Sequence, residues 1–466
     1  MSFFLSHKTS IIVFSLAVAV RIIFFAGIAL YVGISRLDHG LLPGSDSLRY
    51  LQLGKNLEHL GIFSDAAVPP YTPEQTIEPL YPVFLAGIFF VHEGVFFAAF
   101  IQILLAGVSA IILYKIANLY FSEKLSWLAA ILFIVEPVAI YLSGALFTET
   151  IFVPLFLFAI YLFLKYADEG CVLSEDFFAS GVFLGLSALT RPEAQFLGII
   201  FFLFFIVFKH TGGWKKSLQK GLVFLLGFYI ILFPWLLRNK IMNGTWQTSA
   251  IGIHKLYLFD LLAFYSYQHD VSFADARKAL REQVVAISPY KNDDPTYENA
   301  PYLERVAMSY ISTYPVSFAT FYIAKTAPFF LTDGLRWMFD KFGIGEAPRV
   351  NISGYLIRGK FTQLYDHLNK NELLSLILLF GGVAFWLIIN VAMLAGVIAM
   401  YIQKNKQLYL PVALLFSLVI IFALMSGTVS NPRLRYKAEP LMFILAVYGL
   451  QQGYVVLSNK REKILQ

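Results

Sequence analysis

Residues 10–34 read SIIVFSLAVAVRIIFFAGIALYVGI, and this stretch decides the fold. It holds one charged side chain, Arg21, and its 25 residues exceed the roughly 20 apolar residues that a helix needs to cross a bilayer. Similar runs recur along the 466-residue chain, of which 58% is hydrophobic and 14% charged. Soluble proteins carry about 25% charged residues, so this chain has too few charges to coat soluble domains. The sequence therefore predicts an all-α polytopic membrane protein.

Ten runs are apolar enough to be expected as transmembrane helices. They lie near residues 10–34, 94–119, 125–145, 148–166, 177–190, 193–208, 218–237, 373–401, 408–427 and 440–458. Two further apolar segments, Leu80–Val91 and Tyr314–Leu331, are too short or too interrupted by proline to span. We expect these two to be juxtamembrane helices that lie in the interface at the outer face.

Basic residues in short segments indicate the orientation, because cytoplasmic loops carry an excess of lysine and arginine. They cluster in Lys209–Lys220, in Gln403–Gln407 and in the tail at 460–463. Ten spans that alternate from a cytoplasmic N-terminus place all three clusters inside the cell. The net charge of +6 follows this pattern and does not indicate nucleic acid as a partner. We therefore expect a multi-pass protein of the inner (plasma) membrane.

This topology divides the chain into three regions. Residues 1–237 are expected to form an N-terminal transmembrane module that carries catalysis and includes an outer loop at 35–93. Residues 238–372 form a second outer segment with juxtamembrane helices, and residues 373–466 return as C-terminal transmembrane helices. Both long segments outside the spans then lie on the outer face, where a site is to be sought.

The first outer motif is Gly44-Ser-Asp-Ser-Leu-Arg-Tyr50, shortly after the first span. Asp46 and Arg49 are three residues apart, which places them on one face if a helix begins here. An aspartate that follows Pro43-Gly44 is also typical of a helix N-cap. A purely structural role for Asp46 is therefore the alternative.

Other ionisable residues mark the expected outer ends of helices. Glu78 precedes the short apolar segment that starts at Leu80, Glu149 begins the fourth span, Arg191 lies in the turn after the fifth, and Arg238 ends the seventh. An ionisable residue in a membrane segment is a functional candidate by default. Glu149 would also suit the positive end of a helix dipole, which is its structural alternative.

The loop between the last two spans holds three cations, Arg433, Arg435 and Lys437, on the side where few are expected. Such a cluster needs an anionic partner, and phosphate suits the guanidinium fork because both groups bind in a bidentate way. Lipid headgroups, or the carboxylates of Asp46 and Glu149, are the alternative partners. We expect Arg435, the central member, to lie near Asp46 and to bind phosphate.

Together and in this order, these motifs resemble the GT-C superfamily of integral-membrane glycosyltransferases, and most closely its bacterial protein-mannosyltransferase and aminoarabinose-transferase branch. The resemblance rests on Asp46, Arg49 and Tyr50, on Pro79-Leu80, on Glu149, on Arg191-Pro192 and on the Arg433/Arg435 loop. It covers roughly the first 240 residues and the last 40. The branch often carries a lysine just before the Pro-Leu pair, whereas this chain has Ile77 and Glu78 there.

The resemblance implies an inverting single displacement from a polyprenyl-phosphate-linked sugar onto a protein, lipid or glycan acceptor. Asp46 would take the acceptor proton, and Glu149 would orient the acceptor or help Asp46 to hold a divalent cation such as Mg or Mn. Arg49, Arg191 and Arg435 would bind the donor phosphate, since the lysine is missing. The expected substrate contacts are Tyr50, Glu78, Arg238, Arg433 and Lys437.

Two other classes of function remain open from the sequence. A transporter, flippase or polysaccharide-assembly protein would carry ionisable residues at mid-bilayer depth, whereas here they concentrate at helix ends, with Arg21 as the exception. A noncatalytic scaffold would leave the outer arginines without a role. The identity of the sugar, the acceptor, the metal requirement and the oligomeric state do not follow from these residues.

Overall fold

The computed structural model describes residues 8–166, 175–208, 213–344, 359–369, 373–404 and 406–465. Within these ranges the chain forms helices and no strand, which confirms the all-α prediction. Helices dominate because a backbone in lipid must satisfy its N–H and C=O groups internally. The tract Lys209–Lys220, used above for orientation, lies partly outside the described residues.

The elements alternate long apolar helices with short amphipathic or irregular ones. The N-terminal half consists of α2 (Lys8–Val32), α3 (Ile34–Leu41), α4 (Ser45–Leu60), α5 (Leu80–Val91), α6 (Val95–Asn118), α7 (Glu123–Val135), α8 (Pro137–Gly144), α9 (Glu149–Tyr166), α10 (Glu175–Ala188), the 3₁₀ helix η1 (Pro192–Phe196), α11 (Leu197–Val207) and α12 (Gly213–Asn243).

The second half begins with a group of short helices and ends with three long ones. It consists of α13 (Ile251–Lys255), the π-helix η2 (Leu256–Leu261), α14 (Leu262–His269), α15 (Phe273–Ile287), α16 (Ala300–Thr313), α17 (Pro315–Leu331), α18 (Leu335–Lys341), α20 (Phe361–Asn369), α21 (Leu373–Gln403), α22 (Lys406–Ser426), the 3₁₀ helix η3 (Gly427–Val429), α23 (Pro432–Arg435) and α24 (Glu439–Leu465).

Among the described residues, six helices are long and apolar enough to cross a membrane, or seven if one bent pair counts as a span. The expected number of about ten is therefore not confirmed. The bent pair is α7 and α8, which meet at 60° where a single span was predicted over 125–145. Pro137 begins α8 and cannot continue the hydrogen bonds of α7, and Glu136 caps the new helix by accepting from the Ala139 amide at 2.5 Å.

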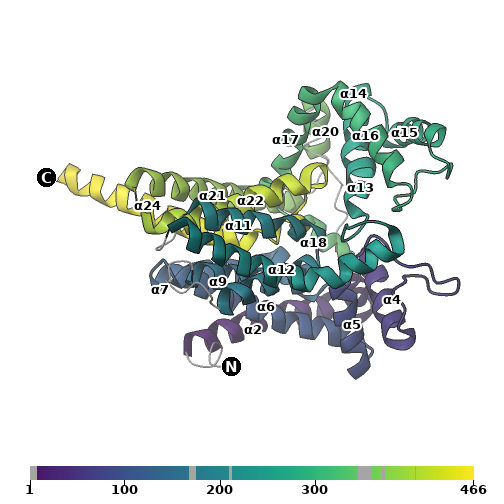
Figure 1. Cartoon of the computed structure of the whole chain (residues 1–466). Coiled ribbons are helices and arrows are strands. Elements are labelled where there is room, and N and C mark those ends of the chain that lie inside the picture. The colour runs from purple at the N-terminus through teal and green to yellow at the C-terminus, as the bar shows by residue number, and fades with distance from the viewer. Residues whose placement is uncertain are drawn as a thin grey trace.

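The long helices lie side by side in one bundle, and the helices α13 to α17 rise from one end of it as a separate lobe (Figure 1). The start of α2 and the end of α24 lie away from the lobe, toward the other end of the bundle. The short helices α4 and α5 lie at the same end as the lobe. The predicted short helix over Leu80–Val91 is α5, with the same bounds, and the segment from Tyr314 becomes α17, which is not among the candidate spans.

Close packing of α10 against α12 depends on glycines. A Cβ at Gly181 would lie 2.0 Å from the Phe224 carbonyl oxygen, and one at Gly227 would lie 2.2 Å from that of Phe178. Only glycine allows the two backbones to approach so closely, which is a common device between membrane helices. This contact fixes α10 and, with it, the turn that follows α10 and carries Arg191.

The lobe has a small apolar core of its own, separate from the main one. Its buried members are Tyr257, Leu261, Leu280, Val284, Leu303, Val306 and Ala307. The lobe is tied to the segment at residues 35–93 by backbone donation from Ala250 to the Gln75 carbonyl at 2.8 Å and from Tyr297 to the Gln75 side chain at 3.0 Å. The lobe and this segment thus form a cap at one end of the bundle.

Candidate active site

Six charged side chains meet under this cap, each from the end of a different element or turn. They are Asp46 from the first turn of α4, Glu149 from the start of α9, Arg191 from the turn after α10, Glu193 from η1, Arg433 from α23 and Lys437 from the turn before α24. We call this set the ion chain. Two backbone bonds fix the loops that carry it, from Leu146 to the Leu41 carbonyl and from Leu80 to the Leu189 carbonyl, both at 2.9 Å.

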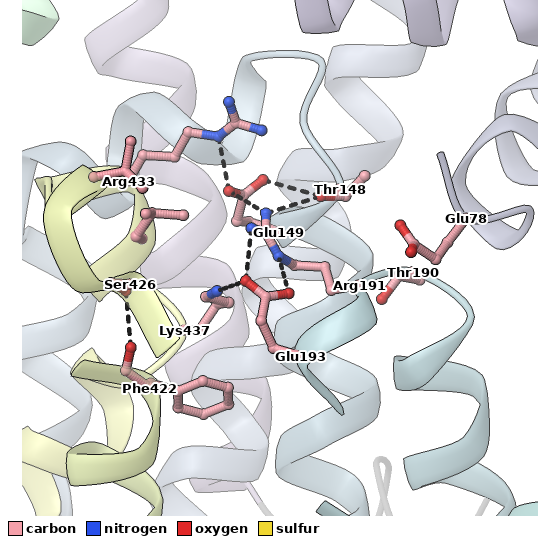
Figure 2. A network of polar contacts seen from close by, with 12 residues as sticks. Glu78, Thr148, Glu149, Thr190, Arg191, Glu193, Phe422, Ser426, Arg433 and Lys437 are labelled. Atoms are coloured by element: carbon pink, nitrogen blue, oxygen red, sulfur yellow. Dashed lines mark hydrogen bonds and ion pairs between the residues drawn. The ribbon is translucent and has the colours of Figure 1, made fainter. Parts of the chain in front are cut away.

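Acids and bases alternate along the ion chain (Figure 2). Arg433 Nη1 donates to Asp46 at 2.8 Å and its Nε donates to Glu149 at 2.8 Å. Arg191 donates to the same Glu149 oxygen at 2.6 Å and to Glu193 at 3.1 Å. Lys437 ends the chain with a bond of 2.6 Å to Glu193. Three acids and three bases balance one another, which is the condition for burying so many charges.

Arg433 holds the central position. Its guanidinium bridges Asp46 and Glu149 and lies 3.7 Å from the centre of the Phe147 ring, a cation–π contact that fixes its plane. Glu149 is fully buried, whereas the Asp46 side chain is 47% exposed. The ion chain therefore opens to its surroundings at the Asp46 end, and Arg433 is the cation that an incoming anion would meet there.

Burial and neighbouring charges shift the pKa values of the bases. Burial alone would lower the pKa of Arg191, but Glu149 and Glu193 raise it above its ordinary value. Burial lowers the pKa of Lys437 to about 8, with the positive charge of Arg191 acting in the same direction and Glu193 opposing it. Arg191 thus stays charged at any working pH, while Lys437 can lose its proton just above neutrality.

Tyr50 and Glu78 lie close to members of the ion chain, whose charges act on both side chains. Tyr50 is buried edge-on against Tyr81 with ring centres 5.1 Å apart, and burial raises its pKa to about 12. Glu78 accepts from the Ser249 hydroxyl at 2.5 Å, and burial raises its pKa to about 8, partly offset by that bond. Glu78 therefore carries its proton at neutral pH and is a neutral hydrogen-bonding group.

Arg49 and Arg238 are not brought into the ion chain. Arg49 donates to Asp65 at 2.7 Å and to Glu74 at 2.6 Å, so its charge is neutralised within the first outer loop. Arg238 lies over the Trp235 ring at 4.6 Å and donates to Asn239. Asp46 and Arg49 do share one helix, but each side chain has its own partners. The described contacts give neither arginine a place beside Glu149.

The structure places the Arg435 side chain differently from the sequence-based expectation. Its side chain is fully buried, pairs with Glu439 at 3.1 Å, donates to the Phe329 and Thr332 carbonyls and lies 3.6 Å from the centre of the Trp386 ring. The place beside Asp46 is taken by Arg433, two residues earlier. The expectation that Arg435 faces Asp46 is therefore corrected, because α23 is helical and residues two apart on a helix point to opposite sides.

The N-cap alternative for Asp46 does not match the helix. The N-cap of α4 is Gly44, with no side-chain capping bond, and Asp46 lies inside the first turn. An acidic residue there still suits the helix dipole. Its described partner, however, is Arg433 on a segment 387 residues away in sequence.

Sequence reasoning missed two members of the site. Glu193 joins Arg191 to Lys437, and the Thr148 hydroxyl accepts from Arg191 at 3.2 Å. Both stand next to residues already selected, in Thr148-Glu149 and Arg191-Pro192-Glu193. Three buried bases need three acids to neutralise them, so the number of charges could have indicated Glu193 from the sequence.

The site does not fit a divalent cation. No group of three or more metal-ligating side chains occurs in the parts of the chain that the structure describes. The two carboxylates expected to share a metal, Asp46 and Glu149, are bridged by the Arg433 guanidinium instead. We therefore derive no step through a metal ion.

Residues 74–237 match the family described as dolichyl-phosphate-mannose-protein mannosyltransferase. This segment, about a third of the chain, includes three members of the ion chain, Glu149, Arg191 and Glu193. No curated protein matches the chain. The match therefore covers the part of the bundle on which much of the site is built.

Solved structures show the same fold. AglB, the archaeal oligosaccharyltransferase from Archaeoglobus fulgidus in complex with an inhibitory peptide and a dolichol-phosphate, aligns with a TM-score of 0.51 at 13% identity over 98% of this chain and 51% of its own. The oligosaccharyltransferase of Archaeoglobus fulgidus in the apo form aligns with a TM-score of 0.50 at 14% identity, over 99% of this chain and 52% of its own. ArnT from Cupriavidus metallidurans aligns over 92% of this chain and 76% of its own at 14% identity, with a TM-score of 0.37. This chain spans about half the length of the oligosaccharyltransferase.

The chain is thus a multi-pass membrane protein whose fold is similar to that of the archaeal oligosaccharyltransferase. Within this fold, residues 74–237 match the protein-mannosyltransferase family. The resemblance indicated by the outer motifs is thereby confirmed.

Proposed function

We propose that the protein is a glycosyltransferase that uses a polyprenyl-phosphate-linked sugar and acts at the outer face of the inner membrane. One observation carries the proposal: Arg433 bridges the half-exposed Asp46 and the buried Glu149 at the open end of the ion chain. A base and a phosphate-binding cation thus lie within one hydrogen bond of each other. The complex of AglB with a dolichol-phosphate supports a lipid donor for a chain of this fold.

Arg433 has the geometry to bind the donor phosphate. It presents a planar fork whose Nη1 contacts a partly exposed carboxylate, and phosphate oxygens can replace that carboxylate. Arg191 adds a second positive charge, held in place by Glu149 and Glu193. Because these acids hold both guanidiniums in position, little reorganisation is needed as charge develops on the leaving phosphate. Arg49 and Arg435 do not contact the phosphate in this step.

The donor phosphate would also free the base. In the structure Asp46 is paired with Arg433, which makes its carboxylate a poor proton acceptor. When a phosphate takes that guanidinium, Asp46 can accept the proton of the acceptor hydroxyl. The acceptor oxygen then bonds to the anomeric carbon, the bond from that carbon to the phosphate oxygen breaks, and polyprenyl phosphate leaves with both electrons. The product has inverted anomeric configuration.

Tyr50, Glu78 and Lys437 fit supporting roles around this step. Glu78 is protonated near neutrality and can hydrogen-bond a sugar hydroxyl as a neutral group, whereas a lysine at the same place would do so as a cation. Lys437 keeps Glu193 neutralised, and Glu193 orients Arg191. Tyr50 packs against Tyr81 behind Asp46 and limits the space there.

The proposal can be tested with the full chain in lipid nanodiscs. Polyprenyl-phosphate sugars are supplied one at a time with an envelope extract as the source of acceptors, and release of polyprenyl phosphate is measured. We expect one or a few donors to be consumed, with the sugar appearing on a protein, lipid or glycan. A protein that moves a lipid-linked sugar across vesicles while leaving its glycosidic bond intact would support the transporter alternative and overturn the proposal.

A further inference from the structure

A cavity of about 440 Å³ lies at the end of the bundle opposite the ion chain. It is lined by residues of four helices: Lys8, Thr9, Ser10, Tyr114, Lys115, Asn118, Leu119, Glu123 and Tyr161. Helix α9 connects the two sites, since it begins at Glu149 and reaches the cavity at Tyr161, about 18 Å further along its axis. The cavity therefore lies at the end of the bundle away from the proposed reaction.

The cavity is built like a small polar cup. Ser10, Tyr114 and Tyr161 are buried and form its floor, whereas Lys8 and Asn118 are exposed at its rim and Lys115 lies between them. The hydroxyl groups on the floor are both donors and acceptors, and the lysines are donors only. Such a lining is suited to a ligand with several acceptor oxygens.

Its charge favours an anion. Lys8 and Lys115 line the cavity together with a single acid, Glu123, and the charge of Lys165 acts on Lys115 from one side. The Lys165 ammonium is 5.7 Å from the centre of the Tyr161 ring, so it lies against a wall of the cavity. Asp176 also acts on Tyr161 and offsets Lys165, so the two lysines and one carboxylate of the lining leave an excess of one positive charge. Such an excess suits a pocket between membrane helices that takes an anionic headgroup.

The surface next to the cavity is apolar and exposed. Below Lys8, helix α2 exposes Ile11 by 50% and Ile12 by 55%, and below Glu123 helix α7 exposes Leu128 and Ile131. Helices α2 and α7 pack against each other, so these side chains border the same side of the cavity. A ligand with a charged head in the cup could lay acyl chains along them. A free phosphate ion would leave this surface unused.

We propose that this cavity binds the phosphodiester headgroup of an anionic phospholipid from the leaflet at this end of the bundle. Lys8 and Lys115 contact the phosphate oxygens, the floor hydroxyls contact the phosphate or a headgroup hydroxyl, and the acyl chains follow α2 and α7. The site is distinct from the proposed donor site, and it does not depend on the transferase activity.

The test compares lipids retained by the purified full chain under native mass spectrometry. Phosphatidylglycerol and phosphatidylcholine are titrated against the wild type, Lys8→Gln, Lys115→Gln and the control Lys124→Gln, an exposed lysine of α7 that does not line the cavity. We expect a preference for phosphatidylglycerol that falls about fivefold with each cavity lysine, the equivalent of about 1 kcal/mol per charge, and that Lys124→Gln leaves unchanged.

Equal losses in the cavity variants and in Lys124→Gln would overturn the proposal, because a diffuse basic surface would then explain the preference. Displacement of the lipid by millimolar inorganic phosphate would show an ion site rather than a lipid site. If Lys115→Gln does not fold, Lys8→Gln at the exposed rim still decides the outcome.

Discussion

Two arginines in one short helix, α23, differ in their exposure and in their partners. Arg433 is 17% exposed and joins the ion chain through Asp46 and Glu149, whereas Arg435 is fully buried against Trp386 and pairs with Glu439. Both are held by a carboxylate and both lie over an aromatic ring. Only the first lies beside a partly exposed carboxylate that a ligand can replace.

In the proposed mechanism, this difference separates a structural charge from a catalytic one. The Arg435 pair has no exposed atom and also binds two backbone carbonyls, so it locks α23 onto α17. By that contact it positions Arg433 for the ion chain. Changes at the Arg435 region should therefore affect folding first, and changes at the Asp46 end should affect activity alone.

Asp46→Asn should give the largest effect on turnover. Loss of a general base costs roughly 10²–10⁴ in rate, and the amide keeps the size of the side chain. The thermal midpoint in detergent should stay close to that of the wild type. Asp270→Asn is the matched control, because Asp270 is exposed and its left-handed backbone also suits asparagine. Full activity with a lowered midpoint would restore a structural role for Asp46.

Arg435→Gln should mainly destabilise the protein. It leaves Glu439 buried without its cation, which costs about 3–5 kcal/mol. Arg433→Gln is the counterpart, and it should keep a folded protein, since Asp46 is exposed and Glu149 retains Arg191. Thermal unfolding of both variants, followed by size-exclusion chromatography, makes the comparison. A stable Arg435→Gln that has lost only activity would reverse the roles assigned to the two arginines.

Arg433→Lys should lower kcat/KM for the donor by about 10², because the ammonium keeps the charge but loses the planar fork that binds phosphate in a bidentate way. Arg191→Lys should give a loss of the same order. Steady-state kinetics over a range of donor concentrations measures both effects. A normal donor kcat/KM in Arg433→Lys would remove this residue from phosphate binding.

Glu78 should affect the pH dependence of stability rather than turnover. Burial raises its pKa from an ordinary 4.5 to about 8, so between these values the folded state holds a proton that the unfolded state has released. Its contribution to stability is complete below about pH 4.5 and is lost as the pH rises towards 8, by at most about 1.4 kcal/mol per pH unit. Glu78→Gln should flatten this slope in thermal unfolding curves measured from pH 5 to pH 8. An unchanged slope would mean that Glu78 is ionised in the fold.

The sequence was sufficient for the class of fold and for five residues that the structure brings together. Apolar runs and sparse charge predicted a helical membrane protein, and Asp46, Glu149, Arg191, Arg433 and Lys437 do meet. The number of spans could not be obtained from hydropathy, since Pro137 breaks one predicted span at 60° and α10 and α11 are short. Hydropathy shows how long an apolar run is, but it does not show where the helix bends.

The misassignment within α23 has a specific cause. Arg433, Arg435 and Lys437 alternate with other residues, and in an extended loop such residues share one side. The segment is helical instead, which turns Arg435 away from the other two. Partners such as Trp386 and Glu439 belong to the packing of α21 and α24, and a single sequence does not reveal that packing.

The most direct test is a structure of the protein with polyprenyl phosphate bound in a nanodisc. The account predicts a phosphate about 3 Å from the Arg433 guanidinium, close to Arg191, with Asp46 released from its present pairing and Arg435 still bound to Glu439. A phosphate held by Arg435, or one bound away from α23 while Arg433 still bridges Asp46 and Glu149, would contradict it.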